Sequence, residues 1–214
     1  MPRKLPQIPQ NLIRADLADC LNIACEDGDA VCEVKFEDDV VEDIRANVLE
    51  FDRCLFRKVR FCSSDIDRIH FLNCRFEHCD FSGFAFREGT IRRTAFENCR
   101  GVGATFSHMN LQEVGFNDCA LDYMSLVDCK LREVILSNCQ MEHTLFYGCT
   151  QKALSLNACR MAFAEILDTA MSEVDLSDCD INGIRTAIQM LSGTKVSLLQ
   201  SPILLSLCGI QVKS

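Results

Sequence analysis

A five-residue spacing of large apolar side chains constrains the fold of this chain more than any other feature of its sequence. In FLNCRFEHCDFSGFAF, residues 71–86, a phenylalanine stands at every fifth position. This phase has 27 positions from Phe51 to Ile181, and all are Phe, Leu, Ile or Met except Gly101 and Gln151. An α-helix repeats every 3.6 residues and a β-strand every 2, so neither element alone explains the pattern. The backbone must turn at a regular interval of five residues.

The other positions of each five-residue unit predict a coil with four sides. The residue two before each large apolar one is mostly small, and the remaining three positions hold nearly all the Arg, Glu, Asp and Asn. Two inward residues that alternate with an outward one form a short strand, and the other two turn the corner. Four sides close a coil of 20 residues, and successive coils stack as parallel strands about 4.8 Å apart. Columns at this interval hold one residue type, as in Phe56, Phe76, Phe96 and Phe116.

The repeated unit resembles that of the pentapeptide-repeat proteins. Their unit is a small residue, a polar residue, Leu or Phe, and two variable residues, and here it reads CRFEH at residues 74–78. The resemblance implies an all-β solenoid, the right-handed quadrilateral β-helix of that family, with short helical caps at the termini. We expect an N-terminal capping segment at 1–30, the β-helix at 31–196, and a C-terminal capping helix and dimerisation tail at 197–214.

Some segments depart from the regular period. Apolar residues recur at helical spacing after Asn11, a candidate N-cap, and before Gly28, so we expect a helix at about 11–25. The acidic stretch 37–50 keeps the phase loosely, which is compatible with a protruding loop or with an irregular coil. At 101–103, Gly-Val-Gly lacks the inward apolar side chain, which is compatible with a functional bulge or with a tolerated defect in packing.

The C-terminal sequence SPILLSLCGI predicts a second helix. Ser201 is its candidate N-cap, Pro202 lies in its first turn, and Gly209 is its candidate C-cap. The helix has more apolar side chains than one end cap can hide, so we expect a two-fold dimer interface at this end. The interface is predicted to contain Ile203, Leu204, Leu205, Leu207 and Ile210.

Cysteine is unusually frequent, with fifteen in the chain, and most of them follow the repeat. A redox or metal site is one interpretation of the cysteines that align from coil to coil, but no common zinc-ligand spacing appears. Stacked strands keep Cβ atoms about 4.8 Å apart, whereas a disulfide needs about 3.8 Å. We therefore expect reduced, buried thiols at Cys54, Cys74, Cys79, Cys99, Cys119, Cys129, Cys139, Cys149, Cys159 and Cys179. The thiols expected to react are Cys62 first, then Cys20, Cys25, Cys32 and Cys208.

The distribution of charge excludes some classes of function. The net charge is −9; residues 51–100 sum to +3, whereas residues 101–181 sum to −8. An acidic body repels nucleic acid, so we expect no direct nucleic acid binding. No apolar run reaches the length of a membrane span, and the N-terminus lacks the features of a secretory signal. We therefore expect a cytoplasmic protein without a membrane association.

Two sets of surface residues are candidate sites, and neither predicts catalysis. The four histidines all fall at outward positions, outside any nucleophile, zinc or phosphate-loop motif, so we expect no enzyme, no metal and no cofactor. The first set is a group of acidic columns: Glu113, Asp118, Asp128, Glu133, Asp168, Glu173 and Asp178. The second is an apolar set at outward positions that would meet a partner or the chain's own tail: Tyr123, Val127, Leu145, Tyr147, Phe163 and Leu167.

Within the family, the chain resembles the Qnr-type subgroup through its length, its helical C-terminal tail and its Phe- and Cys-rich repeats. That resemblance implies a homodimer that binds DNA gyrase and topoisomerase IV and protects them from quinolones. An acidic rod would act as a DNA mimic, because it would present negative charge to a groove that normally holds DNA. The alternative is a structural or protein-interaction scaffold without a topoisomerase partner.

Overall fold

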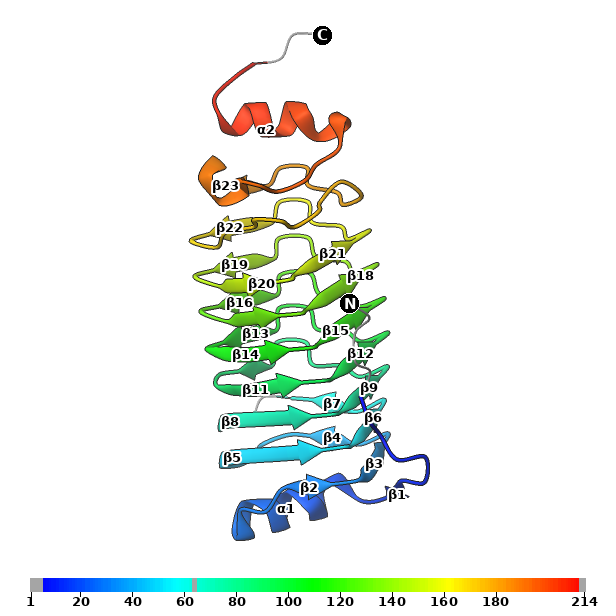
Figure 1. The fold of residues 1–214 in the computed structure, drawn as a ribbon. Coiled ribbons are helices and arrows are strands. Elements are labelled where there is room, and N and C mark those ends of the chain that lie inside the picture. Colours follow the sequence, from blue (N-terminus) through cyan, green and yellow to red (C-terminus); the bar gives the residue numbers. More distant parts are fainter. Residues whose placement is uncertain (1–5, 63–64, 212–214) are drawn as a thin grey trace.

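The chain winds into a rod of stacked coils with four flat faces, closed by a helix at each end (Figure 1). The computed structural model describes residues 6–62 and 65–211. Neighbouring strands of each face are parallel and lie one coil apart. We number the faces in the order in which the chain visits them within one coil. The fold class predicted from the five-residue period is confirmed.

The first and second faces contain most of the regular strands. The first face is β2 (Val31–Cys32), β5 (Arg45–Asp52), β8 (Asp65–Leu72), β11 (Gly89–Arg92), β14 (Met109–Gln112), β17 (Lys130–Arg132) and β20 (Thr150–Lys152). The second face is β1 (Ile13–Arg14), β3 (Val34–Glu37), β6 (Leu55–Arg57), β9 (Arg75–Glu77), β12 (Ala95–Glu97), β15 (Gly115–Asn117), β18 (Ile135–Ser137) and β21 (Ser155–Asn157).

The third face has the least regular backbone pairing. It comprises β4 (Val40–Val41) and β7 (Arg60–Phe61), which continue as single bridges from Arg60 through Asp80 and onward to Asp180. The fourth face is β10 (Ala85–Phe86), β13 (Thr105–Ser107), β16 (Ser125–Val127), β19 (Leu145–Tyr147), β22 (Glu165–Leu167) and β23 (Arg185–Thr186).

The register between coils is 20 residues, so equivalent side chains stack. Phe56 pairs with Phe76, Phe76 with Phe96, and Phe96 with Phe116. The rings are nearly parallel, and their centroids are 4.6, 4.5 and 4.5 Å apart. Every position of the five-residue phase from 51 to 181 is buried except Gln151, which is half-buried. The column of phenylalanines is therefore the centre of the core, as the period predicts.

The corners of the coils use a backbone conformation that is rare for residues other than glycine. Corner residues such as Asn73, Asp118, Asp128 and His143 have φ between 51° and 56°. This left-handed region is most accessible to Gly, Asn and Asp, and each corner side chain points away from the core. Acidic residues at the corners are thus held at the edges of the rod.

The two irregular stretches of the sequence are both part of regular coils. Within 37–50, β4 and the start of β5 pair in parallel with β7 and β8, so this stretch is not a protruding loop. At Gly101, a Cβ atom would collide with the ring of Phe81, which fills the space of the missing side chain. The backbone N–H of Gly101 still bonds to Ala120, so no bulge forms.

The N-terminal helix begins later than the sequence predicts. Helix α1 spans Leu17–Asp27, and Asp16, rather than Asn11, is its N-cap, since its carboxylate accepts a hydrogen bond from the Asp19 N–H at 3.1 Å. The expected start fails because Ile13–Arg14 forms β1, which pairs with β3 of the second face. Gly28, with φ 73°, ends the helix.

The C-terminal cap consists of three short helices: η1 (Ile188–Leu191), η2 (Leu198–Gln200) and α2 (Ser201–Leu207). Ser201 is the first residue of α2 and not its N-cap; Gln200 holds that position because η2 runs directly into α2. Cys208 is the C-cap, and Gly209 follows it with φ 74°. In the described part of the chain, no helix is long and apolar enough to span a membrane.

Candidate protein-interaction surfaces

A ladder of ion pairs neutralises the N-terminal half of the rod. Arg57 pairs with Glu77 at 2.7 Å, and Arg75 pairs with Glu97 at 3.0 Å. In both pairs the arginine lies one coil before its carboxylate, on the second face. The excess of arginine at 51–100 is therefore largely used between coils, where each partly exposed pair contributes little energy.

The predicted acidic columns lie on three separate corners of the C-terminal half. Glu133 and Glu173 are at the corner between the first and second faces, Asp118 and Asp178 at the next, and Asp128 and Asp168 at the corner between the fourth and first faces. All six are exposed. Apart from a long contact between Glu133 and Arg132 at 3.9 Å, none of the six forms an ion pair with a described residue.

Glu113 differs from the other predicted acidic residues. It is buried, and its carboxylate accepts a hydrogen bond from Arg93 Nε at 2.9 Å. The pair continues the ladder of the N-terminal half, so Glu113 is a structural residue and not part of the free acidic surface. The five-residue motif alone does not separate it from Glu133, because both stand at the same corner of the repeat. The signal that distinguishes them is Arg93, which stands one coil before Glu113, whereas no arginine stands one coil before Glu133.

The predicted apolar set gathers on the fourth face and at its corner with the third. We call it the fourth-face patch. Tyr123 and Phe163 at the corner are 59% and 48% exposed, Tyr147 and Leu167 are also exposed, and Val127 and Leu145 are half-buried. His143 stands between the two aromatic rings, with ring centroids 4.8 Å from Tyr123 and 5.2 Å from Phe163. His143 is not part of the apolar set predicted from the sequence, although its position 20 residues from each ring is a usable signal.

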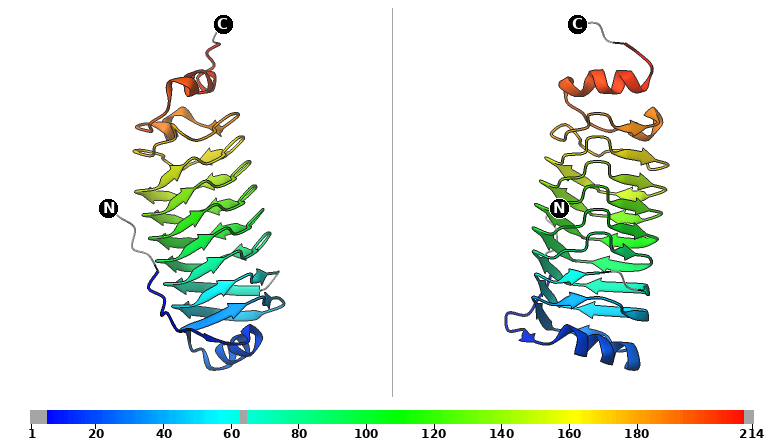
Figure 2. Two further views of the ribbon diagram at one scale, coloured as in Figure 1. Left: turned by 90° about the vertical axis from the view of Figure 1, so that its right-hand side faces the viewer. Right: turned by 180° about the vertical axis from the view of Figure 1, so that it is seen from behind.

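The chain's own termini leave the fourth-face patch open. Helix α2 lies across the end of the rod, and the N-terminal segment runs along the second face (Figure 2). There, residues 8–10 and Leu12 line a hollow together with Lys35, Leu55 and Arg75 of that face. Of the two occupants that the sequence allowed, the tail is therefore excluded for the described residues.

The C-terminal end exposes apolar side chains that only partly match the predicted interface. Ile203, Leu204 and Leu207 are half-buried and pack against the core. Leu205 and Ile210 are exposed. Among the described residues, the most exposed large apolar side chains are those of Leu198 and Leu199 in η2, at 88% and 90%, and neither was part of the predicted interface. They precede the predicted helix, so no helical pattern pointed to them.

The cysteine columns are buried and reduced. Each thiol donates to backbone carbonyl groups; Cys119 Sγ, for example, lies 3.3 Å from the Asn117 oxygen and 3.6 Å from the Phe96 oxygen. Burial raises the pKa of Cys74 well above its ordinary value. The adjacent Cys139 thiol, together with burial, raises the pKa of Cys159 to about 11. The described cysteines are all free.

The accessible thiols differ in part from the prediction. Cys32 and Cys208 are exposed, whereas Cys62 and Cys20 are half-buried. Cys62 is therefore not the most accessible thiol. The side chain of Cys25 lies outside the described part of the structure.

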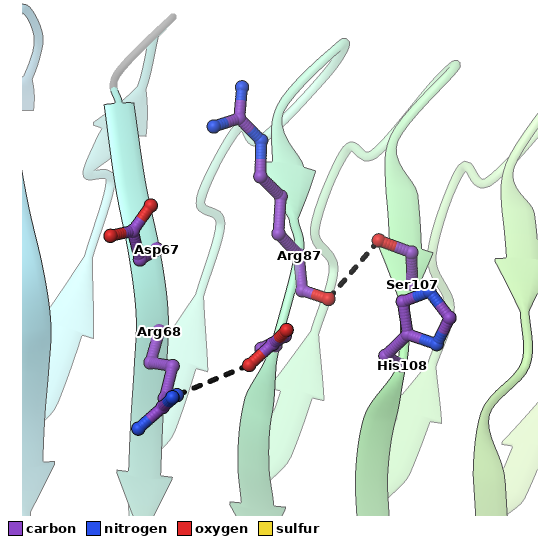
Figure 3. Close-up of a pocket in the computed structure, with 6 residues that line it drawn as sticks. Asp67, Arg68, Arg87, Ser107 and His108 are labelled. Atoms are coloured by element: carbon purple, nitrogen blue, oxygen red, sulfur yellow. Dashed lines mark hydrogen bonds and ion pairs between the residues drawn. The ribbon is translucent and has the colours of Figure 1, made fainter.

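A surface hollow of about 570 Å³ lies where the fourth face meets the first (Figure 3). Three of the four Asp, Glu and Arg side chains that line it are paired, since Arg68 bonds to Glu88 at 3.1 Å and Arg87 bonds to Asp65 at 2.7 Å. Ser107 Oγ donates to the Arg87 carbonyl at 3.2 Å, and His108 lines the same hollow. Nothing here places a base beside a nucleophile. Among residues 6–62 and 65–211, no three His, Cys, Asp or Glu side chains are grouped as metal ligands would be.

A comparison with known protein families identifies the type of repeat that gives this five-residue period. The family described as "Pentapeptide repeat region" matches residues 69–146 and 90–166. Residues 69–166 of the chain are thus a pentapeptide repeat region. Proteins of this family are generally scaffolds without enzymatic activity. None of the curated proteins compared with this chain matches it significantly.

Several solved structures are similar to the chain at low sequence identity. A trypsin-treated variant of QnrB1, a plasmid-mediated fluoroquinolone resistance protein, is 16% identical, with 86% of this chain and 100% of that chain covered and a TM-score of 0.34. Full-length QnrB1 is 14% identical, with coverages of 85% and 99% and a TM-score of 0.27. HetL of the cyanobacterium Nostoc, involved in heterocyst differentiation regulation, is 10% identical, with coverages of 85% and 94% and a TM-score of 0.34.

Proposed function

We propose that this protein is a DNA mimic that binds a type II topoisomerase, DNA gyrase or topoisomerase IV, and protects it from quinolones. The observation that carries the proposal is the charge density of residues 101–181. Their net charge of −8 is spread over about four coils, or about 19 Å of rod at the strand spacing. This is about one net charge per 2.4 Å, close to the one per 1.7 Å of duplex DNA.

The free carboxylates support the same proposal through their arrangement. Because they stand at three corners of a straight rod, they surround it with negative charge, as phosphates surround a duplex. A groove lined with Lys and Arg would attract such a rod without reading any base sequence. The exposed leucines of η2 support a dimer through the C-terminal end, in which two acidic segments would follow one another along one axis. Such a dimer would act in the cytoplasm, where topoisomerases act.

A gyrase supercoiling assay tests the proposal. Wild-type protein is titrated into the reaction with and without a fluoroquinolone, beside the variant Glu133→Lys/Glu173→Lys. We expect the variant to need at least tenfold more protein for the same effect. Higher salt should weaken the wild-type effect, because screening reduces the attraction between exposed charges.

The matched control is Glu42→Lys/Asp43→Lys, which makes the same change of charge at exposed residues of the N-terminal half. It should behave as wild type. An equal loss in both variants would show that only the net charge matters, and DNA mimicry by residues 101–181 would then be wrong. If the wild-type protein has no effect on gyrase or on topoisomerase IV, the alternative of a scaffold with another partner replaces the proposal.

A further inference from the structure

The fourth-face patch is not required by the fold. Tyr123, His143 and Phe163 occupy corner positions with φ between 56° and 60°. Most other non-glycine corners with the same backbone conformation hold Asp, Asn or Glu, and the rest hold Arg, Lys, His or Ala; among the described corners, only Tyr123 and Phe163 are Tyr or Phe. The aromatic column is confined to three coils, because Gly103 precedes it and Gly183 follows it. Two half-exposed aromatic rings at one corner therefore call for an explanation other than coil formation.

The column of rings is held in place by its neighbours. Stacking on His143 fixes both outer rings, with interplanar angles of 7° and 12°. The Phe163 ring lies over Gly183, where a Cβ atom would be only 2.5 Å from it. The surface is thus rigid, so a partner that binds it orders few side chains there.

Uncompensated carboxylates lie along both sides of the fourth-face patch. Asp122 and Glu142 stand on the third-face side, next to the ring column in the chain, and Asp128 and Asp168 stand at the corner with the first face. None of the four forms an ion pair with another described residue. Glu165, within the face itself, pairs with Arg185 at 3.0 Å. An apolar centre between two acidic sides calls for a partner that is apolar in the middle and basic on both sides.

We propose that the fourth-face patch binds an amphipathic α-helix of another protein, one whose apolar stripe is flanked by Lys and Arg. The dimensions agree. From Tyr123 to Val127 the face is about 13 Å wide at 3.3 Å per residue, close to the diameter of about 10–12 Å of a helix. Along the rod, Tyr123 to Phe163 covers two coil spacings, about 10 Å, and two helical turns cover about 11 Å. Apolar side chains that are one turn apart on the partner helix would therefore contact successive coils of the rod.

A second copy of this chain does not fit the same surface. Two fourth-face patches brought together would place Asp128, Asp168 and Glu142 of both copies side by side, and like charges in an interface disfavour association. This surface does not rest on the topoisomerase proposal, and its test uses residues other than Glu133 and Glu173.

The probe is a fluorescein-labelled peptide of 18 leucine and lysine residues, ordered so that a helix has leucine on one face and lysine on both sides of it. Its affinity for the full-length protein is measured by fluorescence anisotropy. A peptide of the same composition in scrambled order is the reference. We expect the ordered peptide to bind at least tenfold more tightly than the scrambled one.

Two variants test the surface, each with a matched control. Tyr123→Asn/Phe163→Asn should weaken binding at least tenfold, whereas His78→Asn, at a corner away from the patch, should leave it within twofold. Asparagine is well suited to this corner conformation, so these variants keep the fold. Circular dichroism and the melting temperature check this directly.

The second variant tests the acidic sides. Asp128→Asn/Asp168→Asn should weaken binding at least threefold and reduce its salt dependence, whereas Asp118→Asn/Asp178→Asn, with the same change of charge on another corner, should not. Equal binding of the two peptides would overturn the proposal. So would equal losses in the two charge variants, because the peptide would then respond only to the total charge of the rod.

Discussion

At the scale of single residues, the cysteine columns stabilise the rod as hydrogen-bond donors and as small buried side chains. Cys74 Sγ lies 3.3 Å from the Leu72 oxygen and 3.4 Å from the Phe51 oxygen. Only the protonated thiol can donate these bonds, and a buried thiolate is poorly solvated. At Cys74 and Cys159, the folded state therefore holds the thiol proton more tightly than the unfolded chain does.

This difference predicts a loss of stability at alkaline pH. The ordinary thiol pKa is 9.0, and in the fold that of Cys159 is raised to about 11, with Cys74 raised as well. Their contribution is complete below about pH 9 and is lost as pH rises toward the folded values, since the unfolded chain then binds fewer protons. Each such thiol lowers the free energy of unfolding by about 1.4 kcal/mol per pH unit in this range. Urea unfolding in a reducing buffer at pH 7 to 10.5 measures how the free energy of unfolding changes with pH.

The control for this prediction is Cys74→Ala/Cys159→Ala. The two proteins differ only at these two positions, so the difference in slope belongs to the two thiols. We expect a shallower decline in the variant above pH 9. A wild-type stability that stays constant to pH 10.5, or identical slopes in both proteins, would contradict the explanation.

What the sequence predicts about single residues depends on whether the repeat determines their surroundings. The inward phase was predictable throughout, because a period of five leaves one orientation for each position. The burial of Glu113 was not, since it depends on Arg93 one coil before it. The stack at His143 and the side-chain filling over Gly101 likewise depend on neighbours 20 residues away, whose positions follow from the repeat but whose contacts do not.

At the scale of elements, the caps provide hydrogen-bond partners for backbone groups that stacking leaves unpaired at the ends of the rod. Gln200 is buried at the C-terminal end, and its Nε2 donates to the carbonyls of Leu176 and Cys179 at 2.8 Å each. Its Oε1 accepts from the Ser197 N–H at 2.7 Å. One side chain thus connects the last coil to η2 and α2. The sequence predicted that a helix closes this end, but the contact lies before the helix, where no pattern marks it.

The variant Gln200→Leu tests this connection. It leaves the Cys179 carbonyl and the Ser197 N–H without these partners, at a cost of about 1–3 kcal/mol each, whereas the Leu176 carbonyl keeps its hydrogen bond from the Cys179 N–H. We expect amide hydrogen exchange to accelerate at least tenfold in η2, α2 and residues 174–181, with little change in residues 51–150, because repeats interact mainly with their neighbours. The control Gln189→Leu changes an exposed glutamine of η1. Uniform acceleration along the rod, or none at all, would show that Gln200 does not hold the cap.

At the scale of the whole molecule, the rod has two ends of different character. The N-terminal end is covered by α1, whose Leu17, Leu21 and Ala24 are buried against the first coils. The C-terminal end has its cap, yet that cap exposes Leu198 and Leu199 beyond it. Fully exposed neighbouring leucines are costly in water, about 1.5–3 kcal/mol each relative to burial. Of the two ends, the C-terminal one is thus the better candidate for association.

The last prediction is that the protein dimerises end to end through these leucines. Leu198→Ser/Leu199→Ser should give a monomer in light scattering, at half the wild-type mass, with unchanged circular dichroism, because neither side chain contributes to the core. A coil spacing of about 4.8 Å over about eight coils gives a rod of about 40 Å, so X-ray scattering should show the maximum dimension falling from about 80 Å. The control Ile13→Ser/Ile23→Ser removes exposed apolar surface at the other end, where these residues are 77% and 59% exposed, and should stay dimeric. A dimer that survives the leucine substitutions, or that dissociates in the control, would place the interface elsewhere, and the two acidic segments would then not follow one another along one axis.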